Sequence, residues 1–255
     1  MKQIRPPDRI LFAENNHQLL PGAHSGATWS HAGTDVTCRV EAGLLAVDVQ
    51  ALGDCAHRAV LRWDEQFPAG TLFLGDHWER GYGDLAWRAF VPERVMPWYF
   101  LAHGAGRTTG WGVKTGAGSL CFWTVDAGGI SLWLDLRNGT MPMQPGDRTL
   151  RAAEVVTGEW DGSPFEAAAS FCRLMSPSPR LPSAPVYGGN DWYYSYGKST
   201  HETILRDTAA ISELAGSAAN RPFSVLDAGW QFCGEANGAP WHLTNTRFPN
   251  MATLA

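Results

Sequence analysis

Two short segments in the last third of the chain combine carboxylates with aromatic rings. Residues 190–194 read Asn-Asp-Trp-Tyr-Tyr, and residues 227–231 read Asp-Ala-Gly-Trp-Gln. A carboxylate accepts hydrogen bonds from hydroxyl groups, and a flat indole packs against the C–H face of a sugar ring, so these residue types suit a carbohydrate site. The candidate sugar-binding residues are Asp191, Trp192, Asp227 and Trp230. Position alone also allows Asp227 to be a helix cap or a loop anchor, because Asp is a favoured cap.

A strand, a helix and a second strand are predicted around these two segments. The apolar runs 186–189 and 223–226 read as strands. Ser199 and Glu202 have the spacing of a capping box that would begin a helix, and Gly216 stands where a left-handed cap would end it. Neighbouring parallel strands end at one rim of a sheet, so we expect both polar segments to meet there.

Three motifs in this part of the chain also fit a known pattern. Residues 188–197, 225–231 and 248–251 read G-G-N-D-W-Y-Y-S-Y-G, V-L-D-A-G-W-Q and F-P-N-M. In this order and spacing they resemble the start of the catalytic barrel in glycoside hydrolase family 36, the melibiases or α-galactosidases, whose members read G-W-N-S-W-Y, I-D-D-G-W-Q and F-P-N-G. Residues 75–87 resemble part of the sandwich domain that precedes the barrel in related proteins. The resemblance therefore implies a β-sandwich followed by a (β/α)8 TIM barrel.

The resemblance assigns roles to three residues. Asp227 matches the first aspartate of the family's paired motif, which hydrogen-bonds galactose hydroxyls. Trp192 matches a tryptophan that lines the sugar pocket, and Trp230 matches a tryptophan that supports the rim. Each role is what the family implies for the matching position of this chain.

The sequence departs from the family pattern at three of these positions. Ala228 stands in place of the second aspartate, Gly189 in place of a tryptophan, and Asp191 in place of a serine. A missing carboxylate removes a charge-assisted hydrogen bond worth about 1.5–3 kcal/mol. We therefore expect a sugar that differs from galactose at the hydroxymethyl group or the 4-position, such as one lacking C6, or else that Asp191 supplies the absent acid.

The family reaction is retaining hydrolysis by two aspartates, of which the nucleophile lies in a K-x-D motif. None of Lys2, Lys114 and Lys198 is followed by Asp two residues later, so we expect no catalytic residue in this chain. A complete barrel needs about 250 residues, whereas residues 182–255 number only 74. The prediction is a truncated, inactive N-terminal piece of a longer α-glycosidase. Plant galactosyl-transferring enzymes are similar to this family, so transglycosylation stays open.

The first two thirds of the chain read as an antiparallel β-sandwich. Short alternating runs fill residues 34–157, and residues 130–136 place every second apolar side chain on one face. Asn138-Gly139 favours a tight hairpin after that run. A helical pattern follows at 163–175. The predicted domains are a sandwich at 1–175, a proline-rich linker at 176–185 and the start of the barrel at 186–255.

One polar loop of the predicted sandwich has two interpretations. Its members Trp78, Glu79 and Arg80 lie among the acidic residues Asp76 and Asp84. A mixed-charge loop commonly forms structural salt bridges. The alternative is a loop that reaches over the barrel mouth and contributes to a sugar subsite.

Composition excludes several classes of protein. Of the 255 residues 44% are hydrophobic, the formal net charge is −5 and only three residues are lysine, so we expect no nucleic-acid partner. No apolar run suits a signal peptide or a membrane span, which favours a cytoplasmic protein. The five cysteines contain no C-x-x-C pair, and helix-breaking residues separate His17, His24 and His31. The sequence therefore predicts neither a metal nor a cofactor.

The expected partner is a glycoside or oligosaccharide, and a homo-oligomer stays open for the longer protein. Twelve tryptophans fit this expectation, although tryptophans also fill the cores of β-rich proteins. The alternative function is a non-catalytic carbohydrate-binding or scaffold protein in which the sandwich alone acts.

Overall fold

The computed structural model describes residues 4–13, 18–51, 57–79, 81, 83, 85–139, 141–232 and 242–254. The chain divides into two compact units, Met1–Pro179 and Arg180–Ala255. We call them the sandwich unit and the α/β unit, and each is described by itself. Among the described residues, no helix is both long and apolar enough to span a membrane.

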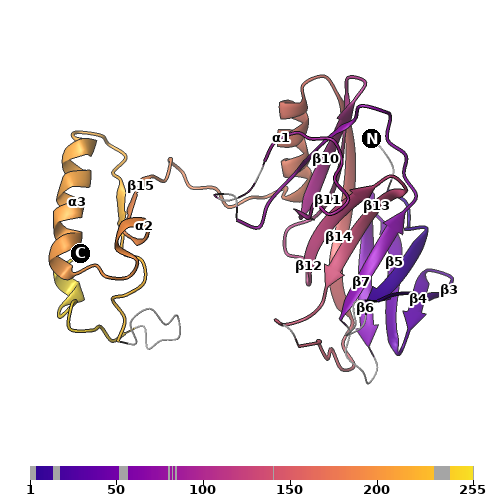
Figure 1. Cartoon of the computed structure of the whole chain (residues 1–255), viewed down its shortest axis with the longest axis horizontal. Coiled ribbons are helices and arrows are strands. Elements are labelled where there is room, and N and C mark those ends of the chain that lie inside the picture. Colours follow the sequence, from indigo (N-terminus) through magenta and orange to yellow (C-terminus); the bar gives the residue numbers. More distant parts are fainter. Residues whose placement is uncertain are drawn as a thin grey trace. The chain divides into compact units, whose positions relative to one another are not determined.

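The sandwich unit consists of two antiparallel sheets (Figure 1). The six-stranded sheet has the order β2 (Leu19–Pro21), β1 (Arg9–Ala13), β7 (Arg58–Trp63), β13 (Gly129–Asp135), β12 (Leu120–Asp126), β9 (Met96–Pro97). The eight-stranded sheet has the order β3 (Ala23–Ser25), β4 (Thr28–His31), β5 (Thr34–Glu41), β6 (Leu44–Ala51), β14 (Leu150–Asp161), β11 (Arg107–Val113), β10 (Tyr99–Gly104), β8 (Leu72–Gly75). The predicted antiparallel sandwich is therefore present.

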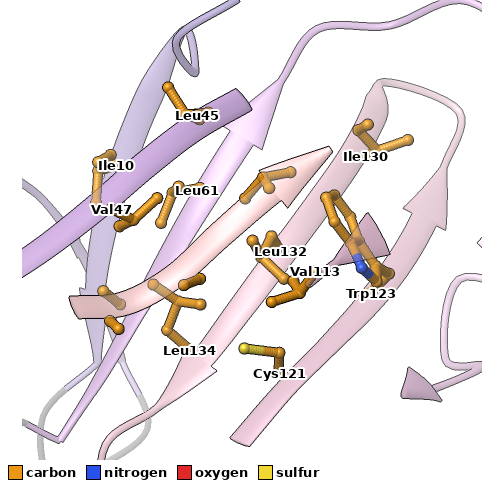
Figure 2. Close-up of a cluster of buried hydrophobic side chains, with 14 of the residues drawn as sticks. Ile10, Leu45, Val47, Leu61, Val113, Cys121, Trp123, Ile130, Leu132 and Leu134 are labelled. Atoms are coloured by element: carbon orange, nitrogen blue, oxygen red, sulfur yellow. The ribbon is translucent and has the colours of Figure 1, made fainter. Parts of the chain in front are cut away.

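A single apolar core fills the space between the two sheets. Leu132 and Leu134 of β13 are fully buried, as the alternation in that run predicts, and they lie with Leu45 and Val47 of β6 in the same cluster (Figure 2). The indoles of Trp63, Trp111 and Trp123 meet in this core, with ring centroids 5.5–6.1 Å apart. Part of the tryptophan excess is therefore explained by packing rather than by ligand binding.

The helix α1 (Pro164–Met175) covers part of the eight-stranded sheet. Ser163 caps it, because the Glu166 N–H donates to the Ser163 hydroxyl, which confirms the helix predicted at 163–175. The buried Phe171 packs where β11 carries glycine. A Cβ at Gly110 would lie 2.8 Å from the Phe171 ring, so a side chain there would displace the helix.

The turn at Asn138 differs from the prediction in what it connects. Asn138 and Met141 exchange backbone hydrogen bonds of 2.9 and 3.1 Å, so a tight turn does form. It does not join β13 to a neighbour, because β13 pairs with β7 and β12 and the next strand along the chain, β14, belongs to the other sheet. The predicted tight turn is therefore confirmed, but it closes a single antiparallel bridge and does not pair β13 with a following strand.

The α/β unit is built on one pair of parallel strands. In chain order its elements are β15 (Gly188–Asn190), α2 (Trp192–Ser195), α3 (His201–Ala215), β16 (Phe223–Val225) and the short 3-10 helix η1 (Met251–Thr253). β15 and β16 pair in parallel with Asn190 opposite Val225. The predicted strand, helix and strand are thus present, and α2 is an additional short helix that the sequence pattern did not predict.

The cap of α3 lies one residue later than predicted. Thr200 and Thr203 form the capping box, through Thr203 N–H to Thr200 Oγ1 at 3.2 Å and Thr200 N–H to Thr203 Oγ1 at 2.9 Å. The predicted pair of Ser199 and Glu202 is therefore wrong, because the next two residues of the same spacing also carry suitable oxygens. Gly216 ends the helix at the predicted residue, but its φ of +52° and ψ of −124° are not those of the predicted left-handed cap.

Candidate functional site

The structure brings the two polar segments together at the ends of β15 and β16. The side-chain amide of Asn190, the last residue of β15, donates to Asp227 Oδ2 at 2.9 Å. The Asp227 backbone N–H donates to Asp191 Oδ1 at 2.8 Å. Residues 36 and 37 positions apart in sequence thus hold each other in place just beyond the carboxyl ends of the strands.

Asp191 is placed to position Asp227. Its side chain is only 4% exposed, and its second oxygen accepts a 3.3 Å hydrogen bond from Ser195 Oγ. Both carboxylate oxygens therefore face protein groups. This geometry makes Asp191 a link between the two strand ends, because a buried carboxylate is costly to place without such partners.

Asp227 keeps acceptor capacity beyond its hydrogen bonds to the described residues. One oxygen accepts from the Ala228 N–H at 2.7 Å, and the other accepts from Asn190. An ionised carboxylate offers about four lone-pair positions. The half-buried Asp227 can therefore accept one or two more hydrogen bonds, as a sugar hydroxyl would donate them.

A set of residues that sequence reasoning missed supports the loop after β16. The carbonyl of Gly229 accepts from Asn245 Nδ2 and from Arg247 Nη2, both at 2.7 Å, and its N–H donates to the buried Gln231 Oε1 at 2.8 Å. Gly229 has a φ of +102°, and a Cβ there would lie 2.2 Å from the Gly197 carbonyl oxygen. Only glycine fits this position, so the glycine of the 225–231 motif was the one sequence signal for this support.

Trp192 and Trp230 lie at this same end of the strands and are both half-buried. The backbone N–H of Trp192 donates to Asn190 Oδ1 at 2.7 Å, and this bond fixes the turn after β15. Its ring packs edge-on against Tyr196, with centroids 6.0 Å apart. Asn245 N–H donates to the Trp230 carbonyl at 3.0 Å, so the loop that carries Trp230 is held by the same Asn that holds Gly229.

A second contact joins α2 to α3. The hydroxyl of Tyr194 donates to Asp207 Oδ2, which raises the pKa of Tyr194 and lowers the pKa of Asp207. These two residues, with Asn190 and Asp191, line a cavity of about 240 Å³ between α3 and the strand pair. Of the four candidate sugar-binding residues only Asp191 lines this cavity, because Asp227, Trp192 and Trp230 are not among its lining residues.

Comparison with known proteins identifies a fold. No family model matches the chain, and no curated protein matches it. Among solved structures, the GH36 alpha-galactosidase AgaB from Geobacillus stearothermophilus aligns with a TM-score of 0.50 and 16% identity, over 96% of this chain and 43% of that one. The chain resembles glycoside hydrolase family 36 in fold. It spans less than half the length of this family 36 structure.

Two structures of the alpha-N-acetylgalactosaminidase NagBb from Bifidobacterium bifidum also align. The GalNAc complex has a TM-score of 0.46 and 13% identity, and the Gal-NHAc-DNJ complex has a TM-score of 0.48 and 11% identity. Each alignment covers 92% of this chain and 48% of that one.

The loop that resembles the sandwich domain of family 36 relatives lies in the sandwich unit. Trp78 is exposed and packs edge-on against Trp98, with centroids 5.4 Å apart. Glu79 is exposed, and its Oε1 accepts from the Gly81 N–H at 3.1 Å. Arg80 lies outside the described residues, as does Asp84. The subsite role of this loop therefore stays a prediction.

Two histidines and two cysteines of the sandwich unit have packing roles. His24 stacks on Trp29 at 4.2 Å, and His31 stacks on Phe12 at 5.7 Å. Burial raises the pKa of Cys38 to about 12 and that of Cys121 to about 11, so both thiols stay protonated. No group of three or more His, Cys, Asp or Glu within the described parts of the chain could hold a metal.

Proposed function

We propose that this chain is the N-terminal part of a retaining α-glycosidase that acts on α-galactoside-like sugars. The observation that carries the proposal is the hydrogen-bonded contact of Asn190, Asp191 and Asp227 at the carboxyl ends of two parallel strands. Functional side chains of α/β barrels and open parallel sheets gather at that end. The fold shared with a family 36 alpha-galactosidase supports the same proposal.

The exposure of the parallel strands supports a larger sheet in the working enzyme. Every residue of β16 is exposed, with Phe223 at 57%. Parallel sheets in folded proteins are covered on both faces. The proposal is therefore that further strands and helices, belonging to a (β/α)8 barrel, cover residues 186–255.

In the proposed mechanism, this chain binds and orients the sugar but does not attack it. Retaining hydrolysis needs a nucleophilic carboxylate and an acid/base carboxylate about 5–5.5 Å apart. The proposal assigns both to residues outside these 255. Within the chain, Asp227 accepts hydrogen bonds from sugar hydroxyls, Trp192 covers the apolar face of the ring and Trp230 supports the rim.

The proposed specificity follows from Ala228. A methyl group at this position accepts no hydrogen bond from a sugar hydroxyl, and Asp191 is turned toward Asp227 and Ser195. We therefore expect the enzyme to favour a glycoside that lacks the hydroxymethyl group or differs at the 4-position. The proposed enzyme is cytoplasmic, acts on a glycoside and has no nucleic-acid or membrane partner. Oligomeric assembly and transglycosylation stay open.

A substrate panel tests this proposal in the longer polypeptide that contains this chain. The panel is the p-nitrophenyl α-galactoside, the corresponding arabinopyranoside without C6 and the α-N-acetylgalactosaminide. We expect kcat/KM to be highest for the arabinopyranoside, and an Ala228→Asp variant to shift the preference toward the galactoside by about tenfold or more. A wild-type preference for the plain galactoside would overturn the specificity. Absence of any glycosidase activity, with sugar binding retained, would favour the non-catalytic alternative.

A further inference from the structure

A cavity of about 310 Å³ lies within the sandwich unit, and the site described above does not use it. It forms where the chain between β7 and β8 passes the β12–β13 turn, and residues 65–73, 89–90 and 126–127 line it. Its size is at the lower end of the range of small-molecule sites, about 300–1,000 Å³. It can therefore enclose one small ring.

Three phenylalanines provide the aromatic part of this cavity. Phe73 is buried and packs edge-on against Phe67 at 4.9 Å and against Phe90 at 6.5 Å. Phe73 also contacts Phe100 of the core at 6.2 Å, so it fixes the other two rings relative to the sandwich. Phe90 is 46% exposed and presents an aromatic surface to solvent at the cavity.

The polar side chains that line the cavity include two carboxylates and one amide beside the hydroxyl of Thr71. Glu65, Gln66 and Asp126 belong to the lining. Arg62 donates two hydrogen bonds of 2.8 and 2.6 Å to Asp126, and these lower the pKa of Asp126. The Gly128 N–H also donates to Asp126 Oδ1 at 2.7 Å, so Asp126 is held by three hydrogen bonds while its side chain remains partly exposed. An acceptor held in this way needs little ordering when a ligand binds.

The loop that carries Phe67 is held in place before any ligand binds. The N–H and the hydroxyl of Thr71 donate to the Pro68 carbonyl at 3.1 and 2.7 Å. Gly70 between them takes a φ of +82° and allows this tight turn. The cavity is therefore a preformed feature of the sandwich.

We propose that this cavity binds one neutral hexopyranose unit of a glycan. The phenylalanine rings would cover the C–H face of the sugar, while the carboxylates and the Gln66 amide bind its hydroxyl groups. No lysine, arginine or histidine is among the described lining residues, so the cavity has no partner for a phosphate or a sugar acid. The charge of Asp126 is already balanced by Arg62, which favours a neutral sugar over a cation. This proposal does not rest on the proposed glycosidase activity.

Titration of the whole 255-residue chain tests the proposal. The probes are methyl α-galactoside and methyl α-glucoside, followed by ligand-observed NMR, with glucose 6-phosphate and tetramethylammonium as comparisons. We expect at least one of the neutral glycosides to bind with a dissociation constant on the order of millimolar. Phe90→Ala is expected to weaken that binding by about fivefold or more, because an aromatic surface is lost.

Two matched variants make the outcome specific. Phe165→Ala removes an exposed ring that is 81% accessible on α1 and lies outside the cavity, and is expected to leave binding within about twofold. Asp227→Ala removes the candidate sugar-binding carboxylate of the α/β unit. It is also expected to leave sugar binding at the sandwich cavity unchanged. The proposal is overturned if neither glycoside binds, if Phe90→Ala has no effect in a folded protein, if Asp227→Ala alone abolishes binding, or if tetramethylammonium or glucose 6-phosphate binds more tightly.

Discussion

The described part of the sandwich unit buries four tryptophans and many aliphatic side chains in its core, whereas the α/β unit buries few apolar groups. Among the described residues of the α/β unit, only Ile204 and Phe248 are buried apolar side chains. Its strand ends are joined instead by the polar contacts of Asn190, Asp191 and Asp227. Apolar packing therefore stabilises the first unit, and directional hydrogen bonds organise the second, which is the pattern expected where side chains must meet a ligand.

A core substitution gives the largest expected effect and tests the first half of this comparison. Leu132→Ala in β13 would leave a cavity in a fully buried position and lower the free energy of unfolding of the sandwich by about 3–5 kcal/mol. Leu214→Ala, at an α3 position that is 89% exposed, is expected to change it by less than about 0.5 kcal/mol. Urea unfolding followed by tryptophan fluorescence measures both. Equal effects would remove the contrast between the units.

Removal of the buried Asp191 carboxylate tests whether hydrogen bonds organise the α/β unit. Asp191→Ala leaves the Asp227 N–H without its acceptor and is expected to cost about 1–3 kcal/mol of local stability in the α/β unit. Amide hydrogen exchange at Asp227 should become faster, while exchange in β13 stays unchanged. Asp207→Ala removes the partner of the exposed Tyr194 and of the exposed Arg206, and is the control with a smaller expected effect. Unchanged exchange at Asp227 in the Asp191→Ala protein would show that Asp191 does not position it.

Acid should weaken the sandwich through one ion-paired carboxylate on its outer face. Burial pushes the pKa of Asp135 upward, but hydrogen bonds from Arg137 and Arg58 outweigh it and lower the pKa to about 2. Because the folded pKa lies below the ordinary value of 3.8, the stabilisation is present above pH 3.8 and is lost as the pH falls toward 2. The expected loss is roughly 1–2 kcal/mol.

Unfolding at several pH values measures this contribution. Asp135→Asn should remove the part of the free energy of unfolding that the wild-type protein loses between pH 3.8 and about pH 2. Asp161→Asn, at a highly exposed partner of Arg107, should leave the pH dependence nearly unchanged. An identical acid profile in all three proteins would contradict the role of Asp135.

Local patterns predicted a part of each unit, but not β1–β4, β8–β11 or α2, and not how distant residues meet. Alternation in residues 130–136 predicted the buried face of β13, and the period at 163–175 predicted α1. The cap of α3 was misplaced because Ser199 and Thr200 are adjacent hydroxyl residues, and each has a polar partner three positions later. The pairing of β14 with β6 and β11, across about a hundred residues in one case, has no local signature.

The candidate site shows the same division between local and distant information. Asp227 and Asp191 could be selected by residue type and by their place after strands. The burial of Asp191, and the support of Gly229 by Asn245 and Arg247, depend on segments that the sequence does not place side by side. Residue type therefore pointed to both carboxylates. Only the structure distinguishes Asp191, which positions Asp227, from Asp227, which can bind a ligand.

The most direct test of the account is the effect of Asp227→Asn on catalysis by the longer polypeptide. The carboxamide keeps the size of the side chain but removes a charged acceptor, which is worth about 1.5–3 kcal/mol for a hydrogen bond to a charged group. We predict that kcat/KM for the preferred α-glycoside falls by about 10- to 150-fold, while Asp207→Asn leaves it within about twofold. An unchanged kcat/KM in a correctly folded Asp227→Asn enzyme would contradict the claim that this residue binds the sugar.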